Sequence, residues 1–553
     1  MSDKLRAMKN RDKSNGKWPV WVKVLTILIT YHFSLITSTA QIRALRYDCM
    51  EAAPSNLPQL GEATAAENGT ATLSLSGGQA KAPRRLPALK TQWDPERIYP
   101  VCVVLMSFSD CDFQGDDPQD HYNRIFNEEG YNEGRGPGCV ADYFVRQSEG
   151  WFHPRFDVYG PVKVSSKSNS HSSSSKKYGA ADFRTALQTL ADSLSLDFSP
   201  YDWDADGKAE HVVFVWAGYG GNEKETQGKG YIWPNTSSFS SLTIGNTVAS
   251  NYSASAELWS NDRSCGIGTI CHEFSHMLGL PDLYPTSTTA TEYSVVDEWD
   301  LMDGGNFINN GWCPCNYSAY EKHLLGWLQL EELTEDTAIS NLQPVSEGGK
   351  AYLIRHTDRE FLVIENRQWT GWDLRTPGRG LLIAHVDDMA SAGNSVNNDA
   401  QHHRYDYFHA DNLSYDQWDV IVTRDSLGRT GGHSPYLSGT AYPCVNDSVN
   451  NHELTLQSVP AATMFNANAE GSTELALPIT NIRLIDDDEL GGVVSFNVGQ
   501  SFYSSIATSE RTYSPSAEGV YNLRGQRVGS NDMRHGQIYL VRKTNGTITK
   551  LFF

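Results

Sequence analysis

Residues 269–284 carry the side-chain types and spacing best suited to chemistry, and they read Thr-Ile-Cys-His-Glu-Phe-Ser-His-Met-Leu-Gly-Leu-Pro-Asp-Leu-Tyr. Residues i and i+4 of a helix share one face, so His272 and His276 can direct both imidazoles at a single point. Two histidines at this spacing are typical of zinc ligands. Glu273 is offset around the helix, where it would act as a base on metal-bound water rather than as a ligand.

Asp282 is the predicted third ligand. Gly279 follows His276 by three residues, where a left-handed residue can end the helix and turn the chain back. Three protein ligands leave a fourth position for water, as a catalytic zinc site requires. The alternative is a surface helix with unrelated histidines, which the correctly placed Gly279 and Asp282 disfavour.

A second group of oxygen ligands alternates along the chain at Asp202, Asp204, Asp206 and Glu210, with a turn glycine inside it. This pattern matches the first half of a calcium loop, but valine stands where an EF-hand needs a bidentate glutamate. The stretch either binds Ca2+ with ligands from elsewhere in the fold or forms an acidic turn that caps a strand. The sequence leaves both alternatives open.

Composition predicts a large globular chain with several domains. The 553 residues are 39% hydrophobic and include 14 Trp, which is enough for well-packed cores. A formal net charge of −21 argues against nucleic-acid binding. Nine cysteines form no CxxC pair and no regular framework, so the disulfide connectivity cannot be read from the sequence.

The N-terminus has the pattern of a secretory signal peptide. A basic lead precedes an apolar segment at 20–36, and Ser-Thr-Ala at 38–40 offers a cleavage site after Ala40. The competing interpretation is an uncleaved membrane anchor, but the short apolar run and the small residues after it favour cleavage. We therefore expect a secreted or cell-surface protein.

The rest of the chain divides into regions that differ in residue composition and hydrophobic pattern. Small and polar residues precede a region where buried strands (101–108 and 211–217) alternate with helices (140–148 and 183–194), and later strands are short and separated by Gly, Pro and Asn. This pattern predicts an α/β (α+β) core followed by a β-rich, sandwich-like domain and a small β tail.

The predicted boundaries are a signal peptide at 1–40, a pro-segment or linker at 41–97 with a candidate processing point at Arg84-Arg85, a zinc metalloprotease domain at 98–330, a β-rich accessory domain at 331–500, and a linker with a strand-forming tail at 501–553.

Several features together resemble the M6 family of secreted bacterial metalloproteases, whose best-known member is immune inhibitor A. They are the zinc motif with Asp282 in third position, Met302 within Trp-Asp-Leu-Met-Asp-Gly-Gly, and the 317–327 segment with its helical end. The stretches 365–373 and 377–387 resemble that family's region after the protease domain.

This resemblance implies a metzincin-like fold, with a mixed sheet over the active-site helix and Met302 in a turn below the zinc. Standard metzincins have histidine where this chain has Asp282. A carboxylate there neutralises part of the metal charge and weakens its Lewis acidity, but the M6 pattern accepts it.

The tail resembles the C-terminal sorting domains of exported proteins from Bacteroidota. The resemblance lies in Val-Tyr-Asn-Leu-Arg-Gly-Gln-Arg-Val at 520–528 and Gly-Gln-Ile-Tyr-Leu-Val at 536–541. It implies recognition by an export machinery.

The predicted function is zinc-dependent endopeptidase activity on protein or peptide substrates. Zinc held by His272, His276 and Asp282 lowers the pKa of bound water, and Glu273 takes the water proton and passes it to the leaving amine. Candidate donors to the oxyanion are Tyr293, Tyr317 and Tyr320, of which none is assigned. The segment 251–259 is either an edge strand that pairs with extended substrate or an ordinary strand.

Two other functions fit parts of the pattern. One is a surface binding or adhesion protein that retains a protease fold, which the intact Glu273 argues against. The other is a structural zinc site, which would require a fourth protein ligand.

Overall fold

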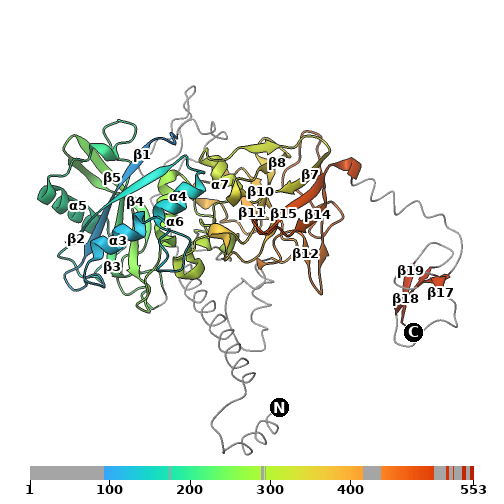
Figure 1. Ribbon diagram of the computed structural model, residues 1–553, viewed down its shortest axis with the longest axis horizontal. Helices are drawn as coiled ribbons and strands as arrows, with labels where there is room; N and C mark the ends of the chain where they lie inside the picture. The colour runs from blue at the N-terminus through green and yellow to red at the C-terminus, as the bar shows by residue number, and fades with distance from the viewer. Residues whose placement is uncertain are drawn as a thin grey trace, which may run out of the picture.

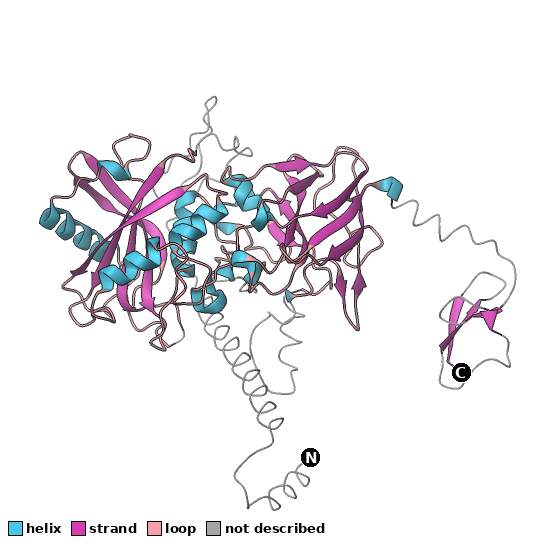
Figure 2. Ribbon diagram, viewed as in Figure 1, coloured by secondary structure: helices cyan, strands magenta, loops and turns pink. Residues whose placement is uncertain are grey.

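The computed structural model describes residues 93–502 except 174–175, 224, 288–289, 291, 293 and 415–436, together with tail strands between 519 and 552. An N-terminal part (residues 93–329) and a β-rich part (residues 330–502) lie side by side (Figure 1). Figure 2 shows the helices concentrated in the N-terminal part and at its border with the β-rich part. The predicted signal peptide, most of the predicted pro-segment and Tyr293 lie outside the described residues.

The N-terminal part is built on a five-stranded sheet of order β2-β1-β3-β5-β4. Its strands are β1 (Ile98–Ser107), β2 (His153–Lys163), β3 (Val212–Tyr219), β4 (Asn235–Ile244) and β5 (Thr247–Leu258). All neighbours run parallel except β4, which pairs antiparallel with β5. Alternate residues of β1 enter two different cores, Val103 one and Val104 the other. The near-continuous apolar run of β1 therefore reflects burial on both faces.

Four helices cover the two faces of this sheet. Helices α3 (Pro118–Asn127), α4 (Val140–Gln147) and α6 (Gly268–Leu278) contribute to one core, and α5 (Ala180–Leu194) contributes to the other. The sequence predicted α4 and α5 at these positions, and the structure confirms them.

The segment proposed as either an edge strand or an ordinary strand is an ordinary strand. Most of it lies in β5, which is paired on one side with β3 and on the other with β4. The edge-strand alternative is therefore wrong, because the tight turn at 245–246 folds β4 back over that side. The edge strands of the sheet are β4 on this side and β2 on the other.

The β-rich part contains a five-stranded sheet of order β11-β10-β9-β8-β6 and a three-stranded sheet of order β14-β15-β7. The strands are β6 (Leu330–Glu332), β7 (Thr337–Leu342), β8 (Ala351–Arg355), β9 (Glu360–Arg367), β10 (Gly380–Asp387), β11 (Tyr405–Tyr407), β14 (Ile479–Ile485) and β15 (Val493–Val498). Ile364 of β9 and Phe496 of β15 belong to one core, so the two sheets share it.

The opposite face of the five-stranded sheet packs against the N-terminal part. Leu353 and Val363 belong to the same core as Phe274 of α6 and Tyr320 of α7 (Ala319–Leu324). The hydrophobic core therefore runs without interruption across position 330, where the sequence predicted a domain boundary.

Shorter elements complete the structure. They are η1 (Ser199–Tyr201), η2 (Asp297–Trp299), η3 (Gly305–Gly311), η4 (Val345–Glu347), η5 (Gly371–Asp373), α8 (Met389–Ala392), η6 (Gly393–Ser395), β12 (Cys444–Val445) and β13 (Asn450–Asn451). The tail forms a separate four-stranded antiparallel sheet from β16 (Gly519–Tyr521), β17 (Arg527–Val528), β18 (Ile538–Arg542) and β19 (Ile548–Phe552).

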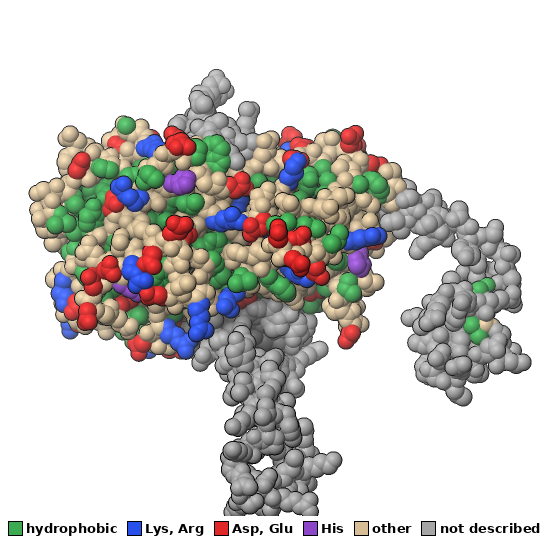
Figure 3. All heavy atoms as spheres, in the orientation of Figure 1, with side chains coloured by type: hydrophobic (Ala, Val, Ile, Leu, Met, Phe, Trp, Pro, Cys, Tyr) green, Lys and Arg blue, Asp and Glu red, His purple; other side chains and the backbone are tan. Residues whose placement is uncertain are grey.

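Figure 3 shows acidic and basic side chains interspersed over the surface of both parts. Among the residues that the structure describes, no helix is long and apolar enough to cross a bilayer.

Glu360, the first residue of β9, anchors a loop of the β-rich part. Its fully buried carboxylate accepts hydrogen bonds from His385 Nε2 (2.7 Å), Phe465 N (2.6 Å), Asn466 N (2.9 Å) and Asn466 Nδ2 (3.0 Å). Burial by itself would raise the pKa of Glu360, but these donors lower the pKa to about 2. The site therefore requires a carboxylate.

We expect Glu360→Gln to lower the free energy of unfolding at pH 7 by on the order of 2 kcal/mol, because a Gln amide would face donors. The folded pKa lies below the unfolded value of about 4.3, so wild type should lose this advantage as the pH falls from about 5 towards 2. Chemical denaturation across this pH range measures the difference.

Glu474→Gln is the matched control, since Glu474 is exposed. It should change stability by less than about 0.5 kcal/mol. A pH-independent difference between wild type and Glu360→Gln would contradict the assignment.

Candidate metal centre

Helix α6 carries the two histidines and is buried along almost its whole length. A Cβ on Gly268, at its start, would lie 1.8 Å from the carbonyl oxygen of Asn306, so only glycine permits this close approach. Gly279 follows the helix with φ of 107° and ψ of 7°, which confirms the predicted left-handed end. The chain can therefore turn back towards the helix immediately after His276.

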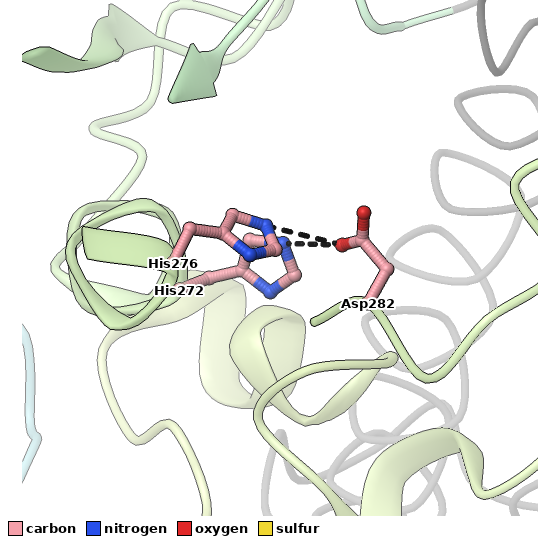
Figure 4. A group of neighbouring side chains, drawn as sticks. All are labelled: His272, His276 and Asp282. Carbon is pink, nitrogen blue, oxygen red and sulfur yellow. Dashed lines mark ion pairs between the residues drawn. The ribbon is translucent and has the colours of Figure 1, made fainter. Parts of the chain in front are cut away.

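The turn brings Asp282 to both histidines. Asp282 Oδ1 lies 3.2 Å from His272 Nε2 and 3.2 Å from His276 Nε2 (Figure 4). The three side chains form one of the two groups of described residues whose ligand atoms are close enough to hold a metal ion. Ligand atoms at 2.0–2.2 Å from a tetrahedral zinc lie roughly 3.3 Å apart, so the observed spacing fits zinc.

Backbone carbonyls orient both imidazole rings. His272 Nδ1 lies 2.9 Å from the carbonyl oxygen of Leu301, and His276 Nδ1 lies 2.8 Å from that of Leu280. A carbonyl accepts only from N–H, so each Nδ1 carries a proton and a neutral ring presents a lone pair at Nε2. Two lone pairs and a carboxylate oxygen then face one another.

Such a group is stable only with positive charge between its members. Burial by itself would lower the pKa of His276, but the Asp282 carboxylate raises the pKa to about 9. Burial would likewise raise the pKa of Asp282, but His276 and His272 hold that pKa well below its usual range. Either protons or a shared metal cation can supply this charge, and the donor set of two imidazoles and one carboxylate suits a metal.

Glu273 lies beside this group and is held by a residue that the sequence did not indicate. Thr236 lies on the edge strand β4. Its Oγ1 is 2.5 Å from the carbonyl oxygen of Glu273 and 3.0 Å from the Oε2 of the same residue. Burial raises the pKa of Glu273. No local pattern could have revealed Thr236, because the contact depends on how β4 crosses α6.

The turn at 300–303 contacts both ligand-bearing segments. Its Leu301 carbonyl orients His272, and its Met302 carbonyl accepts a hydrogen bond from Leu283 N at 2.9 Å. The Met302 side chain is fully buried in the core, as a structural role requires. Asp300 Oδ1 accepts from Met302 N at 2.8 Å and so closes the turn.

Two of the three candidate tyrosines pack in the interior. The Tyr317 hydroxyl contacts Ser275 Oγ, and the Tyr320 ring stacks on Tyr405. Tyr293 lies outside the described residues. Tyr284, to which the sequence assigned no role, stacks on His272 with 6.3 Å between ring centroids and 20° between planes.

The acidic loop forms the second group of potential ligands, from Asp202, Asp204 and Glu210. Asp206 is not in this group, and its carboxylate pairs with Lys208 at 2.8 Å. The other carboxylates accept from amides of their own loop, with Glu210 at 2.7 Å from Trp203 N, and burial raises the pKa of Glu210 to about 7. These contacts describe a self-closed acidic turn, and Ca2+ binding stays a prediction.

Comparisons with known proteins point to the same region. A family model described as the immune inhibitor A peptidase M6 catalytic domain matches residues 106–331, which include α6. The chain is also 22% identical over 258 residues to pre-pro-metalloprotease PrtV of Vibrio cholerae serotype O1, in strain M66-2 and in strain ATCC 39315 / El Tor Inaba N16961. The alignment covers 39% of this chain and only 28% of each relative.

These findings show that residues 106–331 resemble a metallopeptidase catalytic domain. They confirm the predicted resemblance for the protease region. The resemblances of 365–387 and of the tail stay predictions.

We expect Asp282→Ala to weaken zinc binding at least about 100-fold, because it removes the one anionic ligand atom and leaves two imidazoles. Competition with a chromogenic chelator measures the affinity. Asp192→Ala, which removes an exposed carboxylate of α5, should leave the affinity unchanged. Equal affinity of Asp282→Ala and wild type would show that the third ligand lies elsewhere.

Proposed function

We propose that this protein is a zinc-dependent endopeptidase that is exported from the cell. The observation that carries the proposal is the convergence of His272 Nε2, His276 Nε2 and Asp282 Oδ1, at 3.2 Å from the carboxylate oxygen to each nitrogen, beside a buried glutamate. The match of this region to a metallopeptidase catalytic domain supports it.

His272, His276 and Asp282 would hold the metal. Zinc bound there supplies Lewis acidity, which lowers the pKa of a bound water and polarises the carbonyl of the scissile peptide bond. The carbonyls of Leu301 and Leu280 keep each Nδ1 protonated and so keep each Nε2 free to bind the metal.

Glu273 is the general base and then the general acid. Its carboxylate takes a proton from the attacking water and delivers it to the leaving amine. Burial raises the pKa of Glu273 above its usual value, which suits a group that must both accept and release a proton. Thr236 fixes the carboxylate by donating from Oγ1 to Oε2.

The edge strand β4 is the proposed site for an extended substrate. No described strand pairs with its outer side, so a peptide can add there as a further strand. Because β4 also carries Thr236, a peptide paired with this strand would lie near Glu273.

The finer features of the fold are part of the proposal. We assign a metzincin-like protease domain to 98–330 and a sandwich-like accessory domain to 331–500. Trp93 already packs on Trp327, with ring centroids 5.8 Å apart, so a pro-segment removed on maturation would end before it. A signal peptide at 1–40 and a sorting-like tail would direct export. The Vibrio cholerae relative is called a pre-pro-metalloprotease, which supports a leader and a pro-segment here.

We expect Glu273→Gln to lower kcat for casein or peptide cleavage by at least about 100-fold, because the amide cannot accept the water proton. Zinc content should stay at the wild-type level, since Glu273 is not a ligand. Equal cleavage by the two proteins would overturn the mechanism. Absence of cleavage by zinc-loaded, processed wild type would overturn the peptidase assignment and favour a binding protein.

We expect Thr236→Val to lower kcat about tenfold with little change in KM, because the glutamate carboxylate loses its orienting donor. Thr236→Ser keeps the hydroxyl and should restore most of the activity. Steady-state kinetics on one peptide substrate measures both variants. A similar loss in both variants would assign Thr236 a packing role instead.

A further inference from the structure

The third ligand of the proposed metal centre differs from the other two in how it is supported. His272 and His276 are fixed by one helix, whereas Asp282 lies on an irregular segment beyond the helix end. A metal site requires its ligands to be held within a few tenths of an ångström, which a loop does not provide by itself. Other groups must therefore hold the segment 282–287.

Asn397, a buried residue of the β-rich part, forms a hydrogen bond to this segment. It is 1% exposed, and its Nδ2 donates to the carbonyl of Leu283 at 2.8 Å and to that of Tyr405 at 2.8 Å. Its Oδ1 accepts from Arg404 N at 3.0 Å and from Tyr405 N at 3.1 Å. Every hydrogen-bonding group of this amide is used, so its orientation is fixed.

Leu283, the neighbour of Asp282, is thereby held from both sides. Its N–H donates to the Met302 carbonyl at 2.9 Å, and its carbonyl accepts from Asn397 at 2.8 Å. Its side chain is fully buried. The backbone that carries the Asp282 carboxylate is therefore fixed between the turn at 300–303 and the β-rich part.

Asn398 holds the next residues of the same irregular segment. Its Oδ1 accepts from Thr286 N at 2.6 Å and from Ser287 N at 3.0 Å. Its Nδ2 donates to Thr286 Oγ1 at 3.2 Å, and that hydroxyl donates to the carbonyl of Asn394 at 2.7 Å. Two adjacent asparagines thus bind the chain on both sides of Tyr284.

We propose that Asn397 and Asn398 are positioning residues for the metal centre, through which the β-rich part holds Asp282 in reach of His272 and His276. The proposal rests on the metal site of the proposed function, but not on peptide hydrolysis. It predicts that the N-terminal part depends on the β-rich part for tight metal binding.

Asn398 is the residue to test, because it is only partly buried and a substitution there should fold. Asn398→Ala removes the oxygen that accepts from both amides, whereas Asn398→Asp keeps an oxygen in the same place. Asn446→Ala is the matched control, because Asn446 Oδ1 accepts from Ser448 N and Val449 N, both at 2.8 Å, on an exposed loop.

Two measurements on the full-length chain separate positioning from general stability. Chelator competition gives the zinc affinity, and amide hydrogen exchange at Thr286 and Ser287 reports the local hydrogen bonds. We expect Asn398→Ala to raise the zinc Kd about 10-fold or more, in the range seen for partners of metal ligands, and to speed exchange at both amides. Asn398→Asp and Asn446→Ala should stay close to wild type in both measurements.

The outcomes distinguish the two proposals. If wild type binds zinc and Asn398→Ala binds it equally well, the positioning role is overturned while the metal site stands. If Asn446→Ala weakens zinc as much as Asn398→Ala does, the effect is general stability and the positioning role is again overturned. If zinc binding depends on Asn398 but zinc-loaded wild type cleaves no peptide, the positioning role is supported and the peptidase function fails.

Discussion

The turn at 300–303 is the constraint on which the candidate site depends. Two successive carbonyls of this turn hold segments that carry different ligands. The Leu301 carbonyl accepts from Nδ1 of the ligand His272, and the Met302 carbonyl accepts from the N–H of Leu283, the neighbour of the ligand Asp282. Removing a partner from a buried hydrogen bond costs about 1–3 kcal/mol, and here the loss would also release a ligand. The turn itself is closed by Asp300 and buried with Met302 in the main core. The geometry of the metal centre is therefore a property of core packing as much as of the helix.

The β-rich part is integral to this arrangement. One face of its larger sheet belongs to the core that contains Phe274 of α6, so the two parts cannot separate without exposing apolar surface. Arg367 and Asp373, both buried, form a bidentate pair at 2.8 and 2.6 Å, and this pair also binds the backbone of Asn316 in the N-terminal part. Breaking a buried pair by removing one partner costs about 3–5 kcal/mol, because the remaining charge stays uncompensated.

Much of the fold was predictable because its signals are local. The apolar run of β1 and the helical periodicity of α5 indicated their structures from neighbouring residues alone. The role of β5 was left open, since pairing on a second side depends on where another strand folds. The acidic loop shows the same limit, because alternating carboxylates fit either a cation or the amides of their own turn.

The sequence by itself determined the residues that can bind a metal, since the i, i+4 spacing of His272 and His276 and the left-handed Gly279 act within one helix and one turn. Only the tertiary structure decided how these residues are held. Thr236 lies 37 residues from Glu273, and Asn397 lies 114 residues from Leu283. A hydrogen bond over such a separation leaves no trace in local spacing, because it arises from how strands and loops pack rather than from the order of neighbouring residues.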